Sequence, residues 1–82
     1  MSTPDLMPLA HAVRARRREL GLRQGELAEL AGVSERFVHT VEAGKATVQL
    51  DKLLAVLETL GLHLELRSGG SPGVADRRGA RP

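Results

Sequence analysis

Residues 24–43 have the sequence QGELAELAGVSERFVHTVEA, which predicts two short helices joined at a sharp corner. Apolar or small residues recur at helical spacing on both sides of Gly32, a residue that can take a positive φ without steric strain. Ser34 is placed to cap the second helix through its side-chain oxygen. Val33 is then expected to fill the corner, and the small Ala28 allows the two helices to cross closely.

The front of the second predicted helix is free of residues assigned to the core. A short turn containing glycine is typical of helix-turn-helix units, and in their DNA-binding form this front enters the major groove. A helical hairpin in a small bundle has the same spacing, so the pattern alone leaves both interpretations open. The residues on this front are Glu35, Arg36, Phe37, His39 and Thr40.

Length and composition narrow the class of protein. The chain has 82 residues and no cysteine, which predicts one small domain without disulfides or cysteine-based metal sites. It lacks both a long apolar run and a basic N-terminus followed by an apolar stretch, so we expect a cytoplasmic protein with neither membrane span nor signal peptide. The pI of about 9.9 is weak evidence for nucleic-acid binding, because the formal net charge is only +2.

Catalysis is not expected. The three histidines, His11, His39 and His63, fall on different predicted elements without metal-ligand spacing. Ser34 and His39 are five residues apart on one helix and do not share a face. The sequence therefore predicts no catalytic residues, no metal and no cofactor.

The pattern divides the chain into a flexible N-terminus (1–7), a helical domain (8–61), a strand (62–67) and a disordered Gly-, Pro- and Arg-rich tail (68–82). The arginine run in the first helix is expected to form mostly a solvated face, with Arg17 as the inward exception. The loop 45–49 contains Lys45 and Thr47, which can meet phosphates. Residues expected to face inward are Leu6, Leu9, Val13 and Leu20 in the first helix and Leu50, Leu53, Leu54, Leu57 and Leu60 in the last.

The segment LHLELR, residues 62–67, alternates strictly between leucine and polar residues, which predicts a strand. We find no second strand in the sequence, and a lone strand cannot satisfy its backbone groups. Its predicted partner is the same segment of a second subunit, which gives a two-fold dimer. The residues assigned to the dimer interface are Leu62, Leu64, Leu66, Val56 and Leu60.

With these elements in place, residues 9–61 resemble the Xre class of phage-repressor-type helix-turn-helix proteins. The strand directly after the last helix is similar to that of HipB-like antitoxins. The fold expected from this resemblance is all-α, a four-to-five-helix repressor-like domain with one short C-terminal strand pairing across a dimer. The matching residues are Arg17, Gly21, Leu22, Gln24, Leu27, Ala28, Ala31, Gly32, Val33, Ser34, Val38, Val41, Glu42, Gly44 and Leu50.

The resemblance implies residue roles. Arg17 and Glu42 match a buried ion pair between the first and third helices. The positions implied for base readout are Glu35, Arg36 and Thr40, with Ser34 and His39 as neighbours. Those implied for phosphate contacts are Gln24, Arg23, Lys45 and Thr47. Three residues depart from the family pattern: Arg23 replaces a capping residue, Gly25 weakens the second helix, and Phe37 replaces a small polar residue.

The function implied is a homodimeric, sequence-specific transcriptional repressor of a palindromic operator in double-stranded DNA. It is expected to be the autoregulating antitoxin of a type II toxin-antitoxin pair with a HipA-like toxin. Two alternatives remain, a stand-alone phage-type regulator and a protein-interaction adaptor that has lost DNA binding. Glu35 and the neutral charge of the predicted folded region favour the adaptor, whereas Arg36 and Lys45 favour DNA binding.

Overall fold

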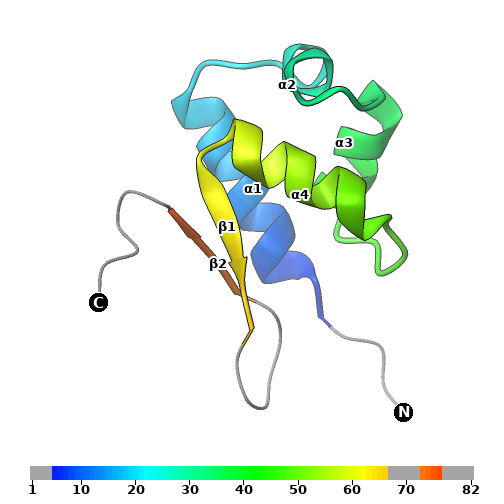
Figure 1. The fold of residues 1–82 in the computed structure, drawn as a ribbon, viewed down its shortest axis with the longest axis vertical. Helices are drawn as coiled ribbons and strands as arrows, with labels where there is room; N and C mark the ends of the chain where they lie inside the picture. Colours follow the sequence, from blue (N-terminus) through cyan, green and yellow to red (C-terminus); the bar gives the residue numbers. More distant parts are fainter. Residues whose placement is uncertain (1–4, 67–72, 77–82) are drawn as a thin grey trace.

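The computed structural model describes residues 5–66 and 73–76, and within them the chain forms a helical domain with a small hairpin (Figure 1). The helical fold expected from the sequence is confirmed, with a two-stranded sheet added. The elements are α1 (Met7–Glu19), α2 (Gln24–Ala31), α3 (Glu35–Glu42), α4 (Leu50–Thr59), β1 (Leu62–Glu65) and β2 (Gly73–Asp76).

Helix α1 begins close to its predicted start. The Asp5 carboxylate accepts a hydrogen bond of 3.0 Å from the Met7 amide, and a proline lies in the first turn, where its missing N–H costs nothing. Asp5 therefore already contacts the first turn of α1, although the sequence analysis assigned residues 1–7 to a flexible N-terminus. Residues 1–4 lie outside the described residues.

The core is built from one face of each helix. Contacts join α1 to α3, α2 to α3, and α2 to α4, so the four helices enclose a single apolar cluster. Burial of this cluster is the main favourable contribution to folding. Its largest fully buried side chains are Val13, Leu27, Val38, Val41, Val56, Leu57 and Leu60.

The buried stripe of α4 differs from the predicted one. Leu50 and Leu54 are 59% and 44% exposed, whereas Val56 is fully buried. The observed stripe, residues 53, 56, 57 and 60, follows i, i+3, i+4 and i+7 spacing. Leu50 and Leu54 lie beside this stripe, and their apolar character led the sequence analysis to place the buried face too far from Val56. Leu20, expected inward, is likewise 46% exposed at the end of α1.

The two strands form an antiparallel hairpin in which Leu62 pairs with Asp76 and Glu65 with Gly73. The prediction that β1 has no partner in its own chain is therefore wrong, as is predicted disorder for residues 73–76. Val74 accounts for the difference, because it packs against the core and holds in place a strand whose other residues are small or polar. The remaining predicted tail, residues 68–72 and 77–82, lies outside the described residues.

Most of the predicted dimer residues belong to the core of their own chain. Val56, Leu60 and Leu62 are at most 7% exposed, so their side chains are already covered within their own chain. Leu64 is half-buried against the core, and Leu66 is 87% exposed. Of the five assigned residues, Leu66 alone is fully available to a partner.

Arg16 fastens the end of α4 to α1. Its Nε donates a hydrogen bond of 2.9 Å to the carbonyl of Leu60, and its side chain is 16% exposed. This carbonyl lies at the C-terminus of α4, where a cation also suits the helix dipole. Arg16 therefore departs from the solvated role predicted for most of the arginine run.

Helix α4 crosses in front of α1, and the hairpin lies beside α1 at the end of the domain away from α3 (Figure 1). The exposed front of α3 and the strands are thus separated by the helical core. In the described residues, no helix is long and apolar enough to span a membrane.

Candidate nucleic-acid interface

The corner between α2 and α3 is fixed by backbone geometry. Gly32 has a φ of 74°, and the amide of the next residue, Val33, donates to the carbonyl of Ala28 at 2.9 Å. The Ser34 hydroxyl then accepts a hydrogen bond of 3.0 Å from the amide of Phe37. This is the expected N-cap, and it sets the direction in which α3 leaves the corner.

Helix α3 presents a polar surface opposite its buried one. Val38 and Val41 are 0% and 2% exposed, whereas Glu35, Arg36 and His39 lie in solvent. Thr40 is half-buried at the edge of this surface. These four polar side chains therefore lie on the side of α3 that faces away from the core, as the sequence predicted.

Phe37 lies between the two faces of α3. It is half-buried and packs against the core, so it does not project from the front of α3 as the sequence analysis placed it. Together with Val48 it lines a groove between α3 and the start of α4. The polar residues of this groove are Ser34, Arg36, Thr40, Thr47, Gln49 and Lys52.

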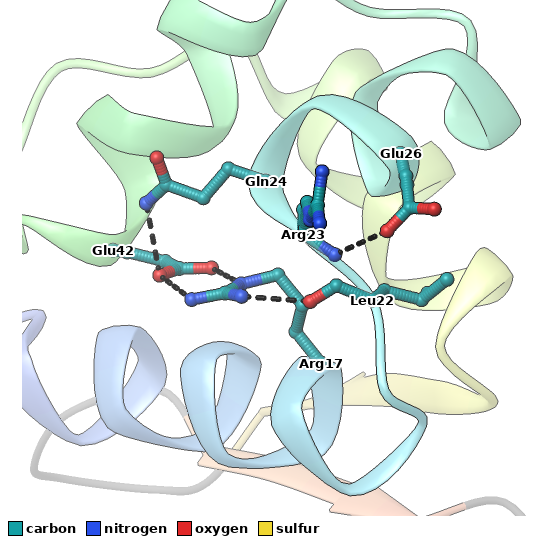
Figure 2. Close-up of polar contacts among 6 residues, drawn as sticks. All are labelled: Arg17, Leu22, Arg23, Gln24, Glu26 and Glu42. Atoms are coloured by element: carbon teal, nitrogen blue, oxygen red, sulfur yellow. Dashed lines mark hydrogen bonds and ion pairs between the residues drawn. The ribbon is translucent and has the colours of Figure 1, made fainter.

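A polar network holds α3 against α1 and α2 (Figure 2). Arg17 donates to both carboxylate oxygens of Glu42, at 2.6 and 3.0 Å, and to the carbonyl of Leu22 at 2.8 Å. Gln24 donates to Glu42 Oε1 at 3.1 Å. The ion pair implied by the resemblance is present, and it is extended by an amide that the sequence assigned to phosphate contact.

The Glu42 carboxyl is ionised in this setting. Burial favours the neutral acid, but hydrogen bonds from Arg17 and Gln24, with the charges of Arg17 and Arg14, outweigh it and hold the pKa of Glu42 below its ordinary value of 4.5. The hydrogen bond to Glu42 in turn raises the pKa of Arg17, although burial opposes this. Side-chain exposures of 11% for Arg17 and 5% for Glu42 make this a largely desolvated pair.

The N-terminus of α2 lacks a side-chain cap from Arg23, because a guanidinium has no hydrogen-bond acceptor. The Glu26 carboxylate instead accepts from the Arg23 amide at 2.8 Å (Figure 2). The carboxylate of Glu26 thus caps the backbone at the start of α2 in place of the Arg23 side chain.

Comparison with known proteins agrees with this geometry. A family model described as a helix-turn-helix domain matches residues 8–68. The uncharacterized HTH-type transcriptional regulator y4mF of Sinorhizobium fredii is 50% identical over 58 residues, which cover 71% of this chain and 76% of that protein. The chain belongs to the helix-turn-helix family of transcriptional regulators.

The solved HipB chain of a structure named HipB-O1-O2 complex has a similar fold. It aligns with a TM-score of 0.69 over 83% of this regulator and 99% of that chain, at 24% sequence identity. The similarity to HipB expected from the sequence is therefore confirmed at the level of the fold.

Gly25 in α2 of this regulator makes room for Glu35 of α3. A Cβ at Gly25 would lie 3.2 Å from Glu35 Oε1, closer than most Cβ contacts. The carboxylate of Glu35 thus packs beside the first turn of α2, where the helix dipole favours a negative charge. The sequence marked Gly25 only as a weak point in α2, because the contact joins residues from two helices.

Sequence reasoning also missed Lys52 and Gln49 in the regulator. Both line the groove beside Arg36 and Thr40, and Lys52 is exposed. The sequence around these two residues does not predict this position, because it depends on how the loop 45–49 places the start of α4 beside α3. Lys45 and Thr47 in that loop are exposed, as contact with a phosphate requires.

Proposed function

We propose that this regulator is a homodimeric, sequence-specific repressor that inserts α3 into the major groove of a palindromic operator. The observation that carries the proposal is the polar front of α3, held at a fixed angle by the Arg17–Glu42 pair and backed by buried Val38 and Val41. Base edges can be reached only by side chains that project from such an exposed helix face.

Base readout is assigned to the front of α3. Arg36 is exposed and can donate two hydrogen bonds to a guanine, the commonest specific contact in the major groove. Glu35 can accept from a cytosine amine once its carboxylate swings away from Gly25. Thr40 and the hydroxyl hydrogen of Ser34 are available as neighbouring contacts.

Phosphate contacts are assigned to both sides of α3. On one side are the N-terminus of α2 with Gln24 and the exposed Arg23. On the other are Lys45 and Thr47, now joined by Lys52. Such contacts fix the register of the protein on the duplex without reading its sequence.

The proposed dimer uses the outer face of α4 and β1. Leu54 is 44% exposed there, Leu66 is 87% exposed, and a groove between the two elements is lined largely by leucine. Apolar area of this kind, left open on a domain with a thin core, favours self-association. A two-fold dimer that presents two α3 helices about 34 Å apart meets successive major grooves.

The antitoxin part of the proposal rests on the resemblance to HipB-like antitoxins and is supported by the likeness of fold to HipB. In this role the regulator binds its own operator and a HipA-like toxin. A stand-alone transcriptional regulator is the second candidate, and the name of the y4mF relative, which specifies a transcriptional regulator, favours it. The neighbouring reading frame distinguishes the two, since an antitoxin is encoded beside its toxin.

DNA binding is tested by gel shift with the palindrome upstream of the gene, at two salt concentrations. We expect binding that weakens as salt rises, and a loss of about 1–3 kcal/mol for Arg36→Ala with relaxed preference at one base pair. Arg18→Ala is the matched control, because Arg18 is an exposed arginine of α1. Binding that ignores salt, or that is equal in both variants, overturns the DNA-binding model.

The dimer and the toxin partner need separate experiments. Sedimentation equilibrium of the wild type and Leu66→Ser is expected to show a dimer that weakens in the variant, because Leu66 is largely exposed. Co-expression with the neighbouring frame, followed by affinity capture, tests the antitoxin role. A monomer at working concentration contradicts the dimer, and a neighbouring product that is not captured favours the stand-alone regulator.

A further inference from the structure

A hollow of about 280 Å³ lies between α1 and α3, beside the start of α2. Figure 2 shows three of the side chains that line it, Arg17, Gln24 and Glu42. Arg14 and His39 complete its polar lining. Side chains of α1, α2 and α3 therefore meet at this hollow, along one edge of α3.

The charges around this hollow favour an anion. Arg17 and Glu42 neutralise each other through two hydrogen bonds of 2.6 and 3.0 Å. Arg14 then adds one uncompensated positive charge, because its exposed side chain forms no hydrogen bond or ion pair with any residue that the structure describes. Arg14 is also close enough for its charge to lower the pKa of Glu42.

His39 faces this hollow, away from the groove on the other side of α3. That groove, beside the start of α4, is lined by Arg36 and Thr40. His39 lies with Arg14 on the flank toward α1. The two flanks of α3 thus carry different chemistry, and His39 belongs with the groups that can hold a phosphate.

We propose that the hollow between α1 and α3 binds one phosphate of the DNA backbone, with Arg14 and His39 as side-chain donors beside the N-terminus of α2. This inference rests on the proposed DNA binding and extends it. It adds Arg14 to the contact surface and moves His39 from base readout to the backbone. Gln24, which the resemblance assigns to a phosphate contact, lines the same hollow.

The test compares Arg14→Gln with Arg18→Gln, an exposed arginine of the same helix that does not line the hollow. Affinities are measured for operator DNA and for a scrambled duplex across a salt series. We expect Arg14→Gln to weaken both duplexes by about the same factor and to lower the salt slope by about one per subunit. Arg18→Gln and Arg14→Lys are expected to keep the wild-type slope.

A second variant, His39→Ala, separates backbone from base contact. A contact to the backbone predicts an equal loss on every sequence, whereas a contact to a base changes the preference at one operator position. The latter result overturns the role proposed for His39. Thermal unfolding of each variant establishes that the folded population is unchanged.

Failure of this inference differs from failure of DNA binding. If the wild type binds DNA and Arg14→Gln binds equally well with an equal salt slope, the phosphate site is wrong while the function stands. If the wild type binds no duplex, titration with inorganic phosphate decides the matter through the NMR signals of His39 and Ala43. Shifts in the wild type that are absent in Arg14→Gln support an anion site, and unmoved signals overturn it.

Discussion

Two parts of the molecule are joined by different kinds of contact. In residues 7–44, a carboxylate on α3 receives hydrogen bonds from α1 and from the start of α2. In residues 50–66 and 73–76, α4 and the hairpin are positioned mainly by apolar packing around Leu57, Leu60 and Leu62. Hydrogen bonds are directional and burial is not. The first part is therefore specified by a few residues, and the second by how much apolar surface each element can cover.

The largest expected effect comes from removing the carboxylate of the first part. Glu42→Ala leaves Arg17 largely buried without a counter-charge, so we expect a loss of about 3 kcal/mol in the free energy of unfolding at pH 7. Urea denaturation measures this loss. Glu29→Ala, an exposed carboxylate on α2, is the control and should stay within about 0.5 kcal/mol of wild type.

The same pair predicts a pH dependence with a definite sign. Because folding lowers the pKa of Glu42 below 4.5, its contribution is present above that value and is lost as pH falls through the folded pKa. The difference in stability between wild type and Glu42→Ala should therefore shrink on acidification below about pH 4.5. A constant difference down to pH 3 would contradict the ion-pair account.

The second effect compares alanine substitutions at two glycines, one of which adds a steric clash to the cost of the positive φ. Gly32 and Gly44 both have a φ of 74°, so alanine at either should cost about 1–2 kcal/mol. A Cβ at Gly44 would also overlap the sulfur of Met7, whereas at Gly32 it meets open space. We expect Gly44→Ala to melt at the lower temperature, and the added change Met7→Ala to remove the difference. Equal melting temperatures would show that Met7 moves aside freely.

The third effect concerns the polar tie between the two parts. Arg16→Met keeps most of the apolar stem but removes the hydrogen bond to the Leu60 carbonyl, with an expected loss of about 1.5 kcal/mol. Arg18→Met changes an exposed arginine of the same helix and should be close to neutral. Chemical denaturation measures the stability of both variants. Equal values would contradict a stabilising role for the Arg16 hydrogen bond and would mean that apolar packing alone holds the end of α4.

The smallest effect lies in the hairpin. Val74 packs against the core, so Val74→Ser should cost about 1 kcal/mol. Ala75→Ser, the neighbouring position on the strand, is the control because alternate residues point to opposite faces. Thermal unfolding of both variants measures the difference. Identical curves would mean that β2 adds nothing to the stability of the domain.

The same division explains what was predictable from the sequence. The corner at Gly32, the cap at Ser34 and the outward side chains of α3 follow from local rules of helix geometry. The Arg17–Glu42 pair came from the family resemblance. The contact of Glu35 with Gly25 and the tie from Arg16 to Leu60 join residues far apart in the chain, which no local pattern reveals.

The C-terminal part was predicted less well for a physical reason. The leucines of α4 cover a wide arc on one side of the helix, so composition alone does not show which part of that arc meets the core. The buried part of the arc includes Val56, which is smaller than leucine by only one carbon and so gives no distinct signal in the sequence. Val74 is the lone branched apolar residue after Leu66, and its value as an anchor depends on the apolar surface that α1 and β1 offer it.

The carboxylate of Glu42 has a consequence for the free-energy cost of binding. Since its hydrogen bonds already join α3 to α1 and α2, the proposed docking on DNA requires no new arrangement of these helices and carries little conformational entropy cost. If Glu35, Arg36 and Thr40 read bases as proposed, exchanging these side chains changes the preferred DNA sequence and leaves the contacts of Glu42 intact. New specificities can arise in such a regulator without a matching loss of thermal tolerance.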